Sequence, residues 1–274
     1  MGHVDKTACV DKNAQIDKDV TIGPYCVVGA GVSLGQGVRL HSHVVVGGDT
    51  TLGKDCEVYS FAAIGFRPQD MKYRGEHSSL VIGDGTVIRE HVTIHPGTKD
   101  GGLVTRIGAH CLLMVGCHIA HDCQIGDHVI IVNGATLGGH VVVGDYAVLG
   151  GLCAVRQHIR IGRHAMVSGM SGLRGDVIPY GFVIGYPACL EGLNLVGLRR
   201  RKFERRAVHK LREAFRMIYG VRERVALAQH LTMVEEQFSQ EPLVMDVVSF
   251  MRHSSALCPP SVSMQKKLAH SSHR

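Results

Sequence analysis

The clearest regularity in the sequence is an aliphatic residue at every sixth position. In the first part of the chain these residues are Val4, Val10, Ile16, Ile22, Val28, Leu34, Leu40, Val46, Leu52, Val58 and Ile64. After an interruption at residues 67–81, the same phase returns at Ile82, Ile88 and Ile94. A second interruption, near residues 99–106, shifts the phase by one before Ile107, Leu113, Ile119, Ile125, Ile131, Leu137, Val143, Leu149, Val155, Ile161, Val167 and Leu173. Such a repeat predicts a solenoid of stacked coils.

Each hexad is expected to form a short strand and a corner. The position four residues after the aliphatic one holds small side chains, as at Ala14, Val20, Cys26, Val32, Cys56, Ala62, Cys111, Cys117, Cys123, Ala135, Val141, Ala147 and Cys153. Three strands would close a triangular coil of about 18 residues, with parallel strands about 4.8 Å apart. Glycine often follows the aliphatic residue, as at Gly23 and Gly35, where we expect unusual φ angles. The pattern predicts a parallel β-helix over residues 4–179.

Six of the nine cysteines occupy the small inward position. The spacing of Cys111, Cys117 and Cys123 is that of the hexad rather than that of a zinc motif. We therefore interpret these cysteines as small buried hydrophobic residues, without a disulfide or metal role.

The period changes after Pro179. Residues 190–220 have the spacing of a basic amphipathic helix, and residues 221–238 and 242–251 are also expected to be helical. Residues 252–274 are rich in Ser, His, Lys and Pro without periodicity, which is typical of disorder. We therefore predict a β-helix domain at 1–189, a helical domain at 190–252 and a disordered tail at 253–274.

Composition is consistent with a globular protein, with 45% hydrophobic residues, but 34 glycines and no tryptophan are unsuited to a core of large side chains. The net charge of +6 is concentrated in residues 199–224 and 266–274, which argues against a general nucleic-acid-binding surface. The sequence has neither a signal peptide nor an apolar run of about 18 residues, so we expect a cytoplasmic protein.

Polar residues gather in two places where chemistry is expected. The first is the insertion at residues 67–80. The second is a pair of files on successive coils, because residues 18 apart stack: His121 lies below Gly139, and Asp122 lies below His140. A histidine beside a carboxylate, with a glycine N–H nearby, has the groups needed for general-base activation of a hydroxyl and stabilisation of an oxyanion. Isolated histidines elsewhere are expected to be surface residues.

Four segments resemble the UDP-N-acetylglucosamine O-acyltransferase family. They are residues 69–76 (QDMKYRGE), 117–123 (CHIAHDC), 138–141 (GGHV) and 192–200, including Asn194 and Arg200. Their mutual spacing also agrees, so the resemblance extends from the start of the chain to about Tyr219. The hexads alone indicate only a superfamily of acyltransferases. The HIAHD segment together with the QDxKY loop is specific to this one family.

The resemblance implies a left-handed β-helix assembled as a homotrimer, with sites between subunits. It implies transfer of a 3-hydroxyacyl chain from acyl carrier protein to the 3-hydroxyl of UDP-N-acetylglucosamine, the first step of lipid A biosynthesis. No metal or separate cofactor is implied, since the donor carries its phosphopantetheine on the carrier protein.

The resemblance also implies roles for individual residues. His121 would be the general base, Asp122 would orient it, and Gly139 would donate its N–H to the oxyanion. The positions that match substrate-contacting residues are Gln69, Asp70, Lys72, His118, His140, Gln157, Asn194 and Arg200. Gly169 matches the position that limits acyl length and would leave the acyl groove open for a longer chain. A basic surface for the acidic carrier protein would include Arg199, Arg201 and Arg205.

The chain departs from the family pattern at two positions. Arg156 replaces a histidine that contributes to activity in the family, and His158 follows two positions on. Val196 replaces a carboxylate that contacts the nucleotide in the family.

Three other kinds of protein share some of these features. An acyltransferase for another nucleotide-sugar or amine acceptor has the same fold, but the related N-acylating enzymes carry an extra N-terminal domain, for which the coils leave no room. A γ-type carbonic anhydrase requires a histidine spacing for zinc that His118 and His121 do not match. A non-catalytic scaffold would not explain the polar files or the loop at Gln69.

Overall fold

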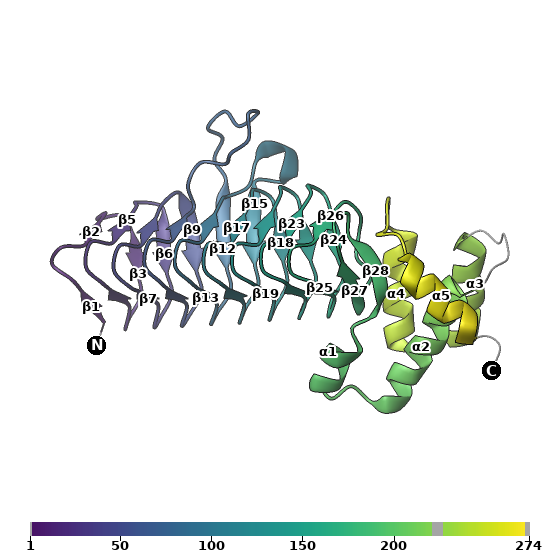
Figure 1. Ribbon diagram of the computed structural model, residues 1–274. Coiled ribbons are helices and arrows are strands. Elements are labelled where there is room, and N and C mark those ends of the chain that lie inside the picture. The colour runs from purple at the N-terminus through teal and green to yellow at the C-terminus, as the bar shows by residue number, and fades with distance from the viewer. Residues whose placement is uncertain (1, 221–226, 272–274) are drawn as a thin grey trace.

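The computed structural model describes residues 2–220 and 227–271 of the chain. Residues 3–184 form a left-handed parallel β-helix, a three-sided prism with a helical region at its C-terminal end (Figure 1). This is the architecture that the hexad repeat and the family resemblance predict.

Within the described residues the prism has three sheets. The first runs in the order β1 (His3–Val4), β4 (Thr21–Ile22), β7 (Arg39–Leu40), β10 (Glu57–Val58), β13 (Val87–Ile88), β16 (Leu112–Leu113), β19 (Ile130–Ile131), β22 (Val148–Leu149), β25 (Met166–Val167), β27 (Gly181–Ile184) and β28 (Cys189–Leu193). The second comprises β2 (Cys9–Val10), β5 (Val27–Val28), β8 (Val45–Val46), β11 (Ala63–Ile64), β14 (Thr93–Ile94), β17 (His118–Ile119), β20 (Thr136–Leu137), β23 (Ala154–Val155) and β26 (Gly172–Leu173). The third comprises β3 (Gln15–Ile16), β6 (Val32–Leu34), β9 (Asp49–Leu52), β12 (Ser79–Ile82), β15 (Val104–Ile107), β18 (Gln124–Ile125), β21 (Val142–Val143) and β24 (Arg160–Ile161).

The strand register confirms the 18-residue coil. Ile119 pairs with Leu137, and Leu137 pairs with Val155. The repeated aliphatic residues fill the interior, except in the first coil, where Val4 is 48% exposed because no coil covers it from below. The prism is thus held together mainly by files of buried aliphatic side chains and by ladders of parallel hydrogen bonds.

The six inward cysteines are buried and unpaired, as predicted. Burial raises the pKa of the Cys117 and Cys123 thiols to about 12. Thiols that stay protonated at neutral pH are unreactive, so these cysteines act as small apolar residues.

The expectation for the corner glycines is wrong. Gly23, Gly35 and Gly83 do not have positive φ; the left-handed conformation falls instead on later residues of the corner, such as Tyr25 and His110. Glycine is needed for a different reason, because successive coils approach closely there. A Cβ on Gly83 would lie 2.6 Å from the Ala109 backbone nitrogen.

The helical region comprises α1 (Leu195–Arg200), α2 (Arg205–Tyr219), α3 (Leu227–Phe238), α4 (Pro242–Arg252) and α5 (Val262–Ser271). The predicted helix at 190–220 differs in two ways. Its first residues belong to β28, which pairs antiparallel with β27. The remainder is broken between α1 and α2, where Lys202 has a φ of 59°. Of the predicted helix at 221–238, residues 221–226 lie outside the described residues.

The C-terminal segment also differs from the expectation of disorder. Leu257 bridges to Asp176 and Pro260 to Leu190, while Cys258 and Met264 are buried. Local composition suggested disorder because few of these residues are apolar, but those few pack against the end of the prism. No helix in the described part of the chain is long and apolar enough to cross a membrane.

Candidate active site

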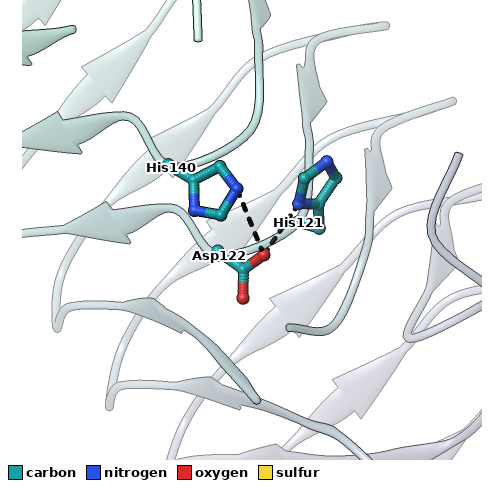
Figure 2. Close-up of side chains that lie close together, drawn as sticks. All are labelled: His121, Asp122 and His140. Carbon is teal, nitrogen blue, oxygen red and sulfur yellow. Dashed lines mark hydrogen bonds and ion pairs between the residues drawn. The ribbon is translucent and has the colours of Figure 1, made fainter. Parts of the chain in front are cut away.

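A buried histidine–aspartate pair lies at the corner between β17 and β18 (Figure 2). The Nδ1 of His121 lies 2.7 Å from Oδ2 of Asp122, and the two side chains are only 6% and 1% exposed. With Nδ1–H donating to Asp122, the Nε2 of His121 carries a free lone pair. This is the tautomer that a general base requires.

Asp122 is held by the turn that follows β14. The Thr98 N–H donates to Oδ1 at 2.7 Å, and the Thr98 hydroxyl donates to Oδ2 at 2.6 Å. The N–H of Asp122 itself donates to the Thr105 hydroxyl at 2.8 Å. Both carboxylate oxygens and the backbone N–H of Asp122 are therefore engaged in hydrogen bonds that fix its orientation.

Gly139 lies directly against the ring of His121. A Cβ at this position would be 2.6 Å from Nε2, so the dyad requires a glycine here. The Gly139 carbonyl accepts from His158, whereas the Gly139 N–H donates to no acceptor within the described residues. A free donor beside Nε2 of His121 is suited to binding an oxyanion.

Three further histidines surround the pair. The ring of His140 meets that of His121 edge-on at 5.1 Å and stacks on His158 at 4.4 Å. His118 shares a hydrogen bond with Thr93 through Nδ1 at 2.7 Å. Burial lowers the pKa of both His118 and His140, so both are neutral at pH 7. The contact of His121 with Gly139 and the stacking of His140 on His158 confirm the predicted stacking of the two polar files.

His95 belongs to the same cluster and was missed by the sequence analysis. Its ring meets that of His118 edge-on at 4.9 Å, and its buried Nδ1 has no partner among the described residues. Burial, with His118 and His121 nearby, lowers its pKa to about 4. The sequence signal for His95 was its position directly after the aliphatic Ile94. Because the second interruption shifts the phase of the repeat, the sequence did not show that His95 lies one coil below Ala120.

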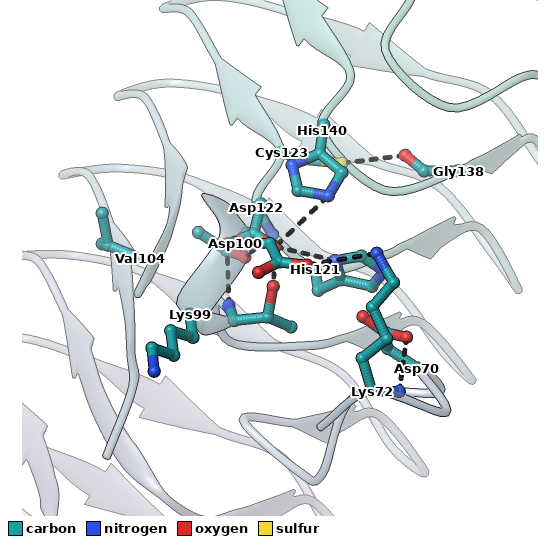
Figure 3. Close-up of polar contacts among 12 residues, drawn as sticks. Asp70, Lys72, Lys99, Asp100, Val104, His121, Asp122, Cys123, Gly138 and His140 are labelled. Atoms are coloured by element: carbon teal, nitrogen blue, oxygen red, sulfur yellow. Dashed lines mark hydrogen bonds and ion pairs between the residues drawn. The ribbon is translucent and has the colours of Figure 1, made fainter. Parts of the chain in front are cut away.

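The first insertion reaches the dyad from one side (Figure 3). Lys72 pairs through Nζ with Oδ2 of Asp100 at 3.1 Å, and Asp100 belongs to the turn that contains Thr98. The Asp70 side chain accepts from the Lys72 N–H, and Gln69 is exposed on the same loop. The structure therefore brings Asp70 and Lys72 close to the dyad.

The predicted nucleotide-side residues lie elsewhere on the chain. Asn194 caps α1, accepting from the Gly197 N–H at 2.9 Å and donating to the His164 carbonyl at 3.0 Å. Together with Arg200 it lines a groove of about 480 Å³ on the outer face of the first sheet. The insertions lie on the opposite side of the prism from α1 (Figure 1). One chain alone does not unite these residues with His121.

The remaining predicted residues lie on exposed surfaces. Gly169 is exposed at the corner between β25 and β26, close to Gly151. Gln157 contacts Gly138, one coil from the dyad, and Arg156 is exposed beside it. Val196, at the position where the family has a carboxylate, lines the groove by α1.

The basic residues predicted to contact a carrier protein lie around the end of α1. Arg199 is exposed, the Arg201 guanidinium lies over the Tyr146 ring at 4.2 Å, and Arg205 begins α2. Of these three residues, Arg201 lines the groove.

The atoms of His121, Asp122 and His140 that could bind a metal lie within 4.8 Å of one another. However, both carboxylate oxygens already accept hydrogen bonds from Thr98, and Oδ2 also accepts from His121. This donor set fits a hydrogen-bonded dyad better than a metal site.

The fold and the dyad define a class, the hexapeptide-repeat acyltransferases. A family model described as bacterial transferase hexapeptide (six repeats) matches residues 105–139, which contain the dyad. A second model, described as Udp N-acetylglucosamine O-acyltransferase, Domain 2, matches residues 176–258.

Relatives extend this match over most of the chain. The acyl-[acyl-carrier-protein]--UDP-N-acetylglucosamine O-acyltransferase of Azorhizobium caulinodans is 55% identical over 226 residues, 81% of this chain and 82% of that protein. Its Caulobacter vibrioides counterpart is 50% identical over 81% of this chain and 84% of that protein. The solved UDP-N-acetylglucosamine acyltransferase of Francisella novicida aligns with a TM-score of 0.91 at 33% identity, covering 98% of both chains. The chain belongs to the UDP-N-acetylglucosamine O-acyltransferase family and is an acyltransferase.

Proposed function

We propose that the protein transfers a 3-hydroxyacyl chain from acyl carrier protein to the 3-hydroxyl of UDP-N-acetylglucosamine, the first step of lipid A biosynthesis. The names of the curated relatives support this substrate pair. The observation that carries the proposal is the buried His121–Asp122 pair, whose free Nε2 lies beside the unused N–H of Gly139.

The proposed mechanism is one acyl transfer with a single base. The Nε2 of His121 accepts the proton of the sugar hydroxyl as its oxygen attacks the thioester carbonyl. The Gly139 N–H donates to the resulting oxyanion, and Asp122 stabilises the imidazolium. Collapse of the tetrahedral intermediate breaks the carbon–sulfur bond, and His121 returns the proton to the departing phosphopantetheine thiol. The reaction as written requires no metal or further cofactor.

Residues around the dyad would bind the acceptor. Gln69, Asp70, His118, His140 and Gln157 are proposed to contact the sugar, and Lys72 to contact the diphosphate. The pair between Lys72 and Asp100 is largely exposed and therefore weak, so an anionic ligand can displace it. Asn194 and Arg200 are proposed to contact the nucleotide.

A homotrimer would unite these parts. The dyad, Gly169 and the groove by α1 lie on different edges or faces of one prism, which supports a site shared between copies. The first sheet also presents an outward row of partly exposed apolar side chains, namely Val87, Leu112, Ile130, Val148, Met166 and Phe182. Such a row on a sheet face is typical of a subunit interface.

The rest of the proposal concerns partners and location. Arg199, Arg201 and Arg205 would steer the acidic carrier protein toward the groove. We propose that residues 1–189 form the catalytic unit, that residues 190–252 dock the donor, and that the protein acts in the cytoplasm.

The test is an assay of the purified protein with UDP-N-acetylglucosamine and 3-hydroxyacyl carrier proteins of graded chain length. We expect ester formation at the 3-hydroxyl. Turnover only with another nucleotide sugar, or with an amine in place of the hydroxyl, would refute the proposed acceptor.

Acyl length provides a separate prediction at Gly169. This residue is exposed and lacks a side chain, so Gly169→Met should shorten the acyl groove and shift the preferred chain length downward in the same panel. An unaltered chain-length profile would contradict the role of Gly169.

A further inference from the structure

The second interruption of the hexad repeat has no role in the mechanism above. It forms a turn from His95 to Leu103 that contains a short 3-10 helix, Lys99–Gly101. The turn closes on Thr98, whose carbonyl accepts from the N–H groups of Gly101 and Leu103.

Thr98 precedes this helix as its N-cap, a position where threonine usually bonds to the helix it begins. Here it makes no side-chain cap hydrogen bond. Instead, its hydroxyl and its N–H each donate to a different oxygen of Asp122. Thr98 thus lacks the usual cap hydrogen bond to its own helix and instead makes two hydrogen bonds to Asp122, 24 positions away.

The turn also seals Asp122 from water. A Cβ on Gly101 would lie 2.0 Å from Cγ of Asp122, so the backbone of the turn lies directly over the carboxylate. On the other side, the Thr105 hydroxyl accepts from the N–H of Asp122. The main chain and both carboxylate oxygens of Asp122 are therefore fixed.

We propose that Thr98 is a positioning residue for the acyl transfer, holding Asp122 so that His121 keeps its proton on Nδ1 and presents Nε2 to the acceptor. This inference rests on the proposed function. Two donors from Thr98 prevent the carboxylate from rotating, and the hydroxyl supplies a hydrogen bond that water cannot replace at a site this buried.

The kinetic test compares Thr98→Val, which removes the hydroxyl and keeps the shape, with Thr98→Ser, which keeps the hydroxyl. We expect Thr98→Val to lower kcat at least about tenfold while KM for UDP-N-acetylglucosamine changes less than about twofold. Thr98→Ser should stay within about threefold of the wild type. Thr86→Val is the matched control, because Thr86 is equally buried and its hydroxyl makes two hydrogen bonds away from the dyad.

A spectroscopic test does not depend on turnover. In 15N-histidine-labelled wild-type protein, with the His121→Gln variant used for assignment, His121 should show the Nδ1–H tautomer at pH 7. A wild type with the His121 proton on Nε2, or a Thr98→Val variant with wild-type kcat, would overturn the positioning role. An inactive wild type that shows the expected tautomer would refute the proposed function, while loss of that tautomer in labelled Thr98→Val would still show that Thr98 positions the dyad.

Discussion

At the scale of single residues, His121 and Asp122 are distinguished by being buried together. If His121 is the base, His121→Ala should lower kcat by about 100-fold or more, which is the contribution typical of general-base catalysis. The melting curve and the oligomer should change little, because the ring lies at a corner rather than in the aliphatic interior. Steady-state kinetics and differential scanning calorimetry measure the two effects.

The matched control for that variant is His41→Ala. His41 lies on an N-terminal coil and pairs with Glu57 at 2.9 Å, remote from the dyad in sequence and fold. The His41→Ala variant should retain wild-type turnover. If His121→Ala retained turnover as well, His121 would not be the base.

His95 predicts a pH dependence of stability. Its pKa in the folded protein is about 4, against 6.5 for the unperturbed group, so the unfolded chain binds more protons between these values. The folded state should therefore lose stability as pH falls from about 6.5 to about 4, by on the order of 2–3 kcal/mol. Urea denaturation at pH 7 and pH 5 measures the loss.

The variant His95→Phe keeps the ring beside His118 but cannot titrate. It should show a smaller fall in stability between pH 7 and pH 5 than the wild type does. Equal falls in the two proteins would exclude His95 as the source.

At the scale of elements, α1 depends on its cap. Asn194→Ala removes both the bond to the Gly197 N–H and the bond to the His164 carbonyl. We expect a loss of about 1 kcal/mol in stability and a rise in KM for UDP-N-acetylglucosamine, because α1 would no longer be held against the groove.

The variant Asn194→Asp separates the two bonds. It keeps an oxygen acceptor for the Gly197 N–H but cannot donate to His164. Stability closer to the wild type than that of Asn194→Ala would assign the effect to the cap, whereas equal losses would assign it to the bond with His164.

The elements also show where prediction from sequence succeeds. Each strand of the prism carries one aliphatic residue of the hexad repeat, so β17 and β20 were predictable from Ile119 and Leu137. Residues 190–193 were predicted as helix because Leu190 and Leu193 also fit a helical period, and only pairing with β27 makes them a strand. Propensity could not decide between the two.

At the scale of the whole molecule, the outward apolar row of the first sheet predicts the assembly. We expect a mass of three times 29.7 kDa by light scattering. Val148→Glu should shift the protein toward the monomer and abolish acyl transfer, because a charge would be buried in the interface.

The control is Val142→Glu on the third sheet, where Val142 also points outward and is 41% exposed. It should remain a trimer. Dissociation by Val142→Glu alone would place the interface on the third sheet instead.

The sequence by itself determined the features that depend on local periodicity. The aliphatic hexads fixed the coils, the small inward residues fixed the width of the prism, and the 18-residue coil placed His121 beside Gly139. Each of these follows from neighbouring residues or from a constant offset along the chain.

Only the tertiary structure decided what the interruptions do. The 25-residue offset between Thr93 and His118 breaks the constant spacing, so no periodicity could place His95 in the histidine cluster or Thr98 on Asp122. The same holds for Met264, which is buried by contacts across the fold rather than by its own segment. Contacts between distant segments depend on how the whole chain packs, and a repeat specifies them only where it is unbroken.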